Sequence, residues 1–269
     1  MKYAFNIEYS NDNIGSDLTL EYSLDKVTED LEAVVVKSID ESMVIFEHKD
    51  ILRDWFPKND CHIFLSHSHK DKNLAVYIAN KLYNNYGIKT FIDSEFWGYV
   101  DDAIKKINHE HNLIPPEDEY LHYGKCMRVA SNFYLILSNA LTDGIDASDS
   151  IWFLNSENAL NACSSSDEEF STFSPWIYTE LNFSSKVKCR GHKDRVSNIY
   201  EDSAGMESIS NITKQADVNV RYAAPNEHLI NVSNDIMKDI MSNNIMKGMV
   251  NKDDVFSCLD IIYKKIRES

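Results

Sequence analysis

The chain has 269 residues, 43% of them hydrophobic and 11% aromatic, which suits one large domain or a medium domain with an appendage. Its net charge of −16 repels nucleic-acid phosphates and anionic lipids, so neither is an expected partner. The sequence contains no run of about 18 apolar residues, so we predict no membrane span. The N-terminus lacks the apolar region of a signal peptide. Five scattered cysteines without a C-x-x-C pair indicate a reducing, cytoplasmic location.

The first sixty residues favour β-strands. "YAFNIEY" (3–9) and "LTLEYSL" (18–24) alternate apolar and polar residues at period two, and "EAVVVKSI" (32–39) and "SMVIFEH" (42–48) continue the pattern. We therefore predict a β-rich module over residues 1–57, packed outside the rest of the fold.

From Cys61 onward, short apolar strands alternate with helices. The predicted strands are 61–66, 88–93, 150–155 and 218–223, of which 150–155 is a continuous apolar run, as expected of a strand covered on both faces. The first predicted helix has Leu74, Ile78 and Leu82 on one face and is closed by Gly87. The other predicted helices lie around 127–141, from Ser174 onward, around 227–247 and around 252–267. This alternation predicts an α/β domain over residues 58–269 with a flavodoxin-like, doubly wound parallel sheet. Ligands of such sheets bind at the carboxyl ends of the strands.

Three segments should meet at that edge, and the first is "SHSHKD" (66–71). Ser68 followed by Asp71 is a capping box, which explains the segment as a plain helix start. Alternatively, the helix N-terminus and the nearby Lys70 bind a phosphate. The neighbouring histidines have no suitably placed carboxylate, so we predict no metal there.

The second segment is "DSEFWGY" (93–99). Its three aromatic residues form either a small core under a loop or a surface on which a base stacks. Asp93 either hydrogen-bonds a ligand or caps the next helix.

The third segment is "SPWIYTEL" (174–181). Ser174 is a good N-cap and Pro175 suits the first helical position. Trp176, Glu180 and Phe183 share one helical stripe. Glu180 therefore either reaches solvent from a core stripe or lies at the floor of an aromatic pocket.

Together these motifs, in this order, resemble a Toll/interleukin-1 receptor (TIR) domain of the bacterial stand-alone kind, and Trp176-x-x-x-Glu180 matches the W-x-x-x-E pattern of such enzymes. The resemblance covers residues from Cys61 to the end of the chain. It implies an NAD+ glycohydrolase or cyclase acting in antiviral defence, with NAD+ as substrate and no cofactor or metal. It also implies self-association and a downstream effector that senses the product.

In that reading Glu180 is the catalytic residue. The expected substrate contacts are Ser66, His67, Ser68, Lys70, Asp93, Trp97 and Trp176. Two alternatives stay open: a non-catalytic TIR scaffold with an exposed Glu180, and a nucleoside deoxyribosyltransferase-like enzyme.

Overall fold

A computed structural model describes residues 1–11, 14–23, 36–40, 43–46, 51, 60–115, 120–160, 170–187, 190–192, 194, 221–246 and 254–269. The chain forms two compact units. The first contains Met1–Tyr22, Asp60–Ile92 and Ile145–Ser269, and the second contains Ser23–Asn59 and Asp93–Gly144. This division differs from the predicted boundary at residue 57, because the N-terminal residues belong to the larger unit.

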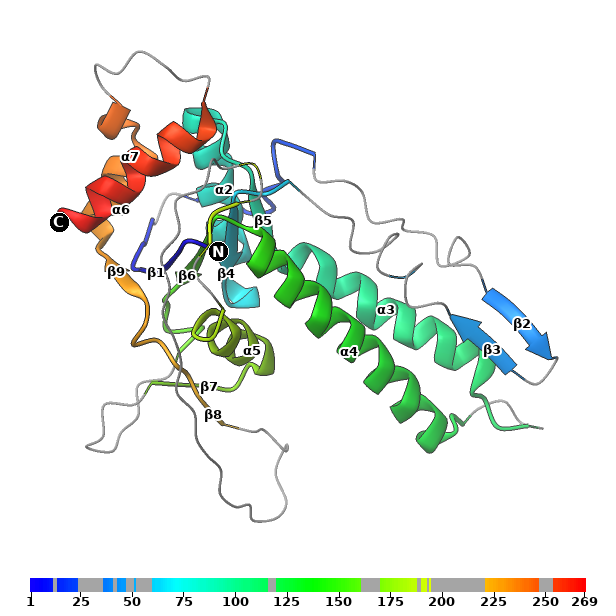
Figure 1. The fold of residues 1–269 in the computed structure, drawn as a ribbon. Coiled ribbons are helices and arrows are strands. Elements are labelled where there is room, and N and C mark those ends of the chain that lie inside the picture. Colours follow the sequence, from blue (N-terminus) through cyan, green and yellow to red (C-terminus); the bar gives the residue numbers. More distant parts are fainter. Residues whose placement is uncertain are drawn as a thin grey trace. The chain divides into compact units, whose positions relative to one another are not determined.

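The first unit is built on a five-stranded parallel sheet (Figure 1). Its strands, in spatial order, are β5 (Thr90–Ile92), β4 (Ile63–Ser66), β6 (Ser150–Leu154), β1 (Tyr3–Ile7) and β9 (Ile230–Val232). Every residue of β6 is buried, as its unbroken apolar run predicts for a strand covered on both faces. The α/β class is confirmed, and the sheet is compatible with a flavodoxin-like fold.

The N-terminal strand β1 lies inside this sheet, so its predicted place in a separate module is wrong. It pairs with β6 on one side and with β9 on the other. Both faces of β1 are covered: Phe5 and Ile7 have no exposed surface, and Asn6 is buried with its amide donating to Asn231 Oδ1 over 2.8 Å. Within β1, the polar position of the alternating pattern is therefore a buried, hydrogen-bonded amide and not a solvent-facing side chain.

The segment 18–22 is not a strand, which corrects a second prediction. It lies along helix α2 (Lys72–Tyr86), where the amide of Asn80 donates to the Thr19 carbonyl over 2.9 Å and accepts from the Glu21 N–H over 2.9 Å. The backbone groups that a strand would use are thus taken by a helix side chain. Helix α2 ends at Gly87, which adopts the predicted left-handed conformation with φ of 69°.

Helices cover both faces of the sheet. The Tyr263 hydroxyl of α7 (Val255–Arg267) lies 2.9 Å from Ser150 Oγ, whereas Glu180 of α5 (Pro175–Ser184) accepts a hydrogen bond from Ser66. Ser66 is in register with Phe153, three residues after Ser150 on β6. Because successive side chains of a strand point to opposite faces, α7 and α5 lie on opposite faces, as in a doubly wound sheet.

The C-terminal part contains a strand that the sequence analysis missed. Residues 227–247 were predicted as one helix, but β9 occupies Ile230–Val232 and only Asn234–Met241 form helix α6. Between β6 and β9, the short strands β7 (Ser171–Thr172) and β8 (Tyr222–Ala223) pair antiparallel. The last predicted helix is confirmed as α7.

Among its described residues, the second unit contains an antiparallel strand pair and two long helices. The strands are β2 (Val36–Asp40) and β3 (Met43–Phe46), and the helices are α3 (Ser94–His111) and α4 (Tyr123–Ala147). Tyr134 of α4 donates to Asp101 of α3 over 2.9 Å. No helix in the described part of the chain has both the length and the apolarity that crossing a membrane requires.

Candidate active site

The carboxyl ends of β4 and β6 form the topological switch point of the sheet. From β4 the chain continues to β5 at one edge, while β6 lies on the other side of β4. Crevices of open α/β sheets form where successive connections diverge in this way. Ser66, the last residue of β4, lies at this point.

Ser66 and Glu180 meet here. The Ser66 hydroxyl donates to Glu180 Oε2 over 2.5 Å, and the two residues are 0% and 1% exposed. A hydrogen bond from a hydroxyl to a carboxylate is short and strong when it is shielded from water. The structure thus brings together two of the residues that the sequence analysis singled out.

The sequence of α5 explains how Glu180 reaches this position. Ser174 caps the helix by accepting a hydrogen bond from the Ile177 N–H over 3.3 Å, with Pro175 in the first helical turn, as predicted. The buried residues Ile177, Glu180, Leu181 and Ser184 then follow at helical spacing. Glu180 belongs to this buried face, so it does not extend into solvent. Trp176, one turn earlier, is half-buried.

His67 directly follows Ser66 and is 4% exposed. Its Nδ1 lies 3.2 Å from the carbonyl oxygen of Leu65. Because a carbonyl only accepts hydrogen bonds, Nδ1 carries a proton in this contact. A titratable group is thus held next to the Ser66–Glu180 pair along the chain.

The predicted capping box at Ser68 is wrong. Ser68 precedes a short 3-10 turn, η2 (His69–Asp71), and its side chain makes no capping hydrogen bond. Asp71 instead accepts from Ser156 Oγ over 2.5 Å and from the Asn158 amide over 2.8 Å. The loops that follow β4 and β6 are therefore tied together at the switch point. Lys70 is exposed on this turn.

The second predicted segment belongs to the other unit. Asp93 is buried and directly precedes α3, and the side chain of Trp97 lies outside the described residues. The expected contribution of Asp93 and Trp97 to substrate binding stays a prediction.

Two further contacts near α5 were missed by the sequence analysis. Ser184 Oγ lies 2.8 Å from His228 Nε2, and burial lowers the pKa of His228 below its usual value. The Arg221 guanidinium lies 5.5 Å from the ring centre of Phe173, which is 48% exposed. Both pairs join residues that are far apart in the sequence, so no spacing pattern could have identified them.

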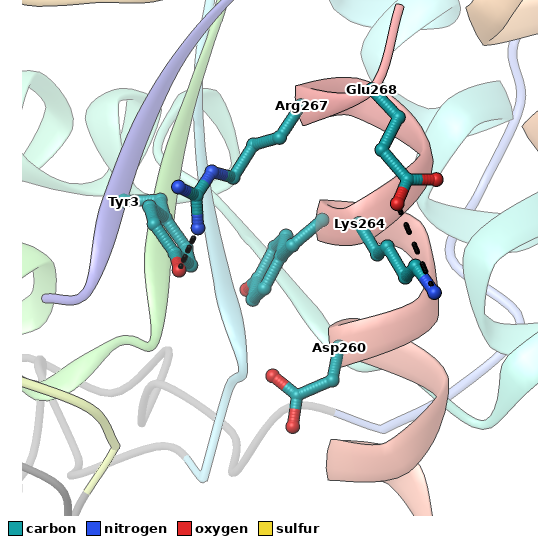
Figure 2. A pocket seen from close by; sticks show the side chains of 6 residues that line it. Tyr3, Asp260, Lys264, Arg267 and Glu268 are labelled. Atoms are coloured by element: carbon teal, nitrogen blue, oxygen red, sulfur yellow. Dashed lines mark hydrogen bonds and ion pairs between the residues drawn. The ribbon is translucent and has the colours of Figure 1, made fainter.

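A cavity of about 320 Å³ lies elsewhere on the first unit (Figure 2). It is lined by Tyr3, Asp260, Tyr263, Lys264, Arg267 and Glu268. Its charges are balanced and largely paired: Lys264 lies 3.8 Å from Glu268, and Arg267 donates to the Tyr3 hydroxyl over 3.4 Å (Figure 2). Tyr3 begins β1, whereas Ser66 ends β4, so this cavity belongs to the amino-terminal edge of the parallel sheet. We assign the candidate active site to the Ser66–Glu180 pair.

Comparison of the chain with family models, with curated proteins and with solved structures finds no match.

Proposed function

We propose that the protein cleaves the bond between nicotinamide and ribose in NAD+, by hydrolysis or cyclisation, with Glu180 as the catalytic residue. The observation that carries this proposal is the buried Glu180 carboxylate, held by Ser66 at the switch point of a parallel sheet. A carboxylate buried away from water is costly unless it is hydrogen-bonded, and such groups concentrate at functional sites. The W-x-x-x-E resemblance supplies the reaction class.

This reaction mainly requires electrostatic stabilisation of the cation that forms on the ribose. When the C1′–N1 bond breaks, its electron pair neutralises the pyridinium nitrogen, so nicotinamide leaves without protonation. The ribose is left as an oxocarbenium cation, which a fixed carboxylate stabilises in a low-dielectric site. Water then adds to C1′ and releases a proton, giving ADP-ribose; an adenine nitrogen in place of water gives a cyclic product.

Residues around α5 offer contacts for the rest of the substrate. Trp176 and Phe173 flank the helix start and offer rings for stacking, and Arg221 provides a cation for the diphosphate. Lys70 is the alternative cation on the β4 side. Because Glu180 is covered in this structure, we expect the substrate to displace neighbouring groups, and activity to depend on a triggering condition.

The test is nicotinamide release from NAD+ by the full chain, followed by chromatography at several protein concentrations. Release that depends on Glu180 supports the proposal. Absence of release at every concentration, together with absence of NAD+ binding by calorimetry, contradicts it.

A scaffold function is the second candidate, and the second unit provides an observation in its favour. Apolar residues at the start of α4 and just before it are exposed: Tyr120 by 68%, Tyr123 by 78% and Met127 by 49%. Exposed apolar patches of this kind mark interaction surfaces. Light scattering of wild type and Tyr123→Ser tests it: a loss of self-association in the variant supports the scaffold, and a monomeric wild type contradicts it.

A further inference from the structure

A histidine and two aspartates meet near the amino-terminal ends of β4 and β6. The potential ligand atoms of Asp60, His192 and Asp194 all lie within 4.8 Å of one another. Asp60 shortly precedes β4, whereas His192 and Asp194 follow α5. Ser66 ends β4, so this cluster and Glu180 belong to opposite edges of the sheet.

His192 is held in place before any ligand arrives. It is 4% exposed, and its backbone N–H donates to Asp149 Oδ1 over 2.9 Å. Asp149 has no exposed surface and accepts a second hydrogen bond from the Tyr263 hydroxyl over 2.8 Å. The His192 ring packs against Phe256 at 5.5 Å between ring centres. Such supporting contacts fix the orientation of a metal-binding imidazole.

The nitrogen that faces Asp194 is in the form that binds metals. The backbone N–H of Asp194 donates to His192 Nδ1 over 3.3 Å, so Nδ1 carries a lone pair and not a proton, and an ion at Nδ1 replaces this long hydrogen bond. Asp194 Oδ2 lies 3.8 Å from the same nitrogen. Two donors about 2.0–2.2 Å from one ion are about 3–4 Å apart, so the separation of these two atoms suits a shared ion once the Asp194 N–H moves away from Nδ1.

The donor set defines the class of ion. One imidazole nitrogen and two carboxylate oxygens suit first-row divalent ions such as Zn²⁺, Mn²⁺ or Fe²⁺, and the absence of a thiolate from the set disfavours Cu⁺. Asp60 is exposed and the Asp194 side chain is 62% exposed, so water completes the coordination. A divalent cation also offsets the repulsion between two aspartates that face one neutral imidazole.

We propose that Asp60, His192 and Asp194 bind a first-row divalent metal ion that clamps the segment after α5 to the start of β4. These three residues lie in distant segments and form no spacing motif, so they were not among the residues on which the prediction of no metal was based. The clamp is structural: it lies away from Glu180, and the proposal does not depend on NAD+ cleavage.

The test uses the full chain, stripped of metal with a chelator and titrated with ZnCl₂ by calorimetry. We expect one Zn²⁺ per chain, at least about a tenfold loss of affinity in Asp194→Asn, and a Zn²⁺-dependent rise in Tm that this variant lacks. Asp194→Asn changes an exposed side chain, so it should fold. His192→Ala serves as a second variant.

His111→Ala is the matched control. His111 Nε2 lies 3.8 Å from Glu110 Oε2, the same separation as in the His192–Asp194 pair, but it belongs to no three-ligand group among the described residues. This variant should bind Zn²⁺ as the wild type does. Equal affinity in wild type and Asp194→Asn, or no binding by the wild type at micromolar Zn²⁺, overturns the proposal.

Discussion

Ser66 donates its hydroxyl to Glu180 across the boundary between a strand end and a helix, with 2.5 Å between the two oxygens. The pair fixes the carboxylate before any substrate arrives. A charge that is already oriented needs no reorganisation during the reaction, which is the source of most electrostatic catalysis. The first two predictions concern the two members of this pair.

Replacing Glu180 by Gln should lower nicotinamide release by about 10²–10³-fold, because one preorganised charge is lost from the transition state. NAD+ binding should persist, since the interaction belongs mainly to the transition state. Release by wild type and variant is compared under the condition that activates the wild type. Glu227→Gln, at an exposed position, is the control and should leave the rate unchanged. Equal rates for wild type and Glu180→Gln would end the assignment of Glu180.

Replacing Ser66 by Ala should destabilise the protein by about 1–3 kcal/mol, because a buried carboxylate loses a short hydrogen bond. It should also slow NAD+ cleavage, since the hydrogen bond that orients the Glu180 carboxylate is lost. Ser68→Ala is the control two residues away: Ser68 makes no capping hydrogen bond, so its change should stay within about 0.5 kcal/mol. Urea denaturation measures both, and equal midpoints would contradict the role of Ser66.

The interior position of β1 predicts a large effect of Phe5→Ala. Phe5 is fully buried and packs on Trp152 and Tyr263 at ring-centre distances of 6.1 and 5.4 Å. Its truncation should lower the free energy of unfolding by about 3–5 kcal/mol. Leu135→Ala, at a 61% exposed position, is the control and should have little effect. If Phe5→Ala is as mild as the control, β1 does not belong to the sheet core.

The two hydrogen bonds of Asn80 predict that Asn80→Ala costs about 1–3 kcal/mol, since a carbonyl and an N–H of the segment 19–21 lose their partner together. Asn84 of the same helix, whose amide donates to Glu21 at the surface, provides the comparison. Asn84→Ala should cost less than about 0.5 kcal/mol. Hydrogen exchange at the Glu21 amide gives a local readout, which should rise only in Asn80→Ala.

Stability should fall as the pH drops below about 6.5, partly through His228. Burial lowers the pKa of His228 from its ordinary value of 6.5, so the unfolded chain takes up a proton before the folded protein does. The unfolded state then binds more protons, and the free energy of unfolding decreases with falling pH. Burial and the nearby His192 lower the pKa of His62 to about 4, and His62 acts in the same direction. The Tm of His228→Gln between pH 8 and pH 5 should decrease less than that of the wild type; parallel curves would exclude His228.

Local sequence patterns predicted the helices and strands best where a single residue determines the local backbone conformation. Gly87 ends α2 and Ser174 starts α5 as the sequence indicates, because a left-handed turn and an N-cap are short-range requirements. The unbroken run of β6 likewise reports burial on both faces.

Predictions failed where a residue that is distant in the sequence determines the local conformation. The alternation over residues 18–22 is typical of a strand, but Asn80 takes two of its backbone hydrogen-bonding groups. The three residues of β9 are too few for a period to show, and their strand forms through pairing with β1. Ser66 and Glu180 were singled out as members of converging segments, but only the fold shows that they bond directly.

The place of β1 in the sheet affects how the protein is made. Among the five strands of the sheet, β1 leaves the ribosome first, yet both of its neighbours, β6 and β9, are synthesised much later. Its apolar side chains therefore stay without their partners during most of translation, a state in which strands associate with the wrong chain. Refolding from denaturant should accordingly be slow for a protein of this size, and a chaperone that shields the nascent N-terminus should raise the yield.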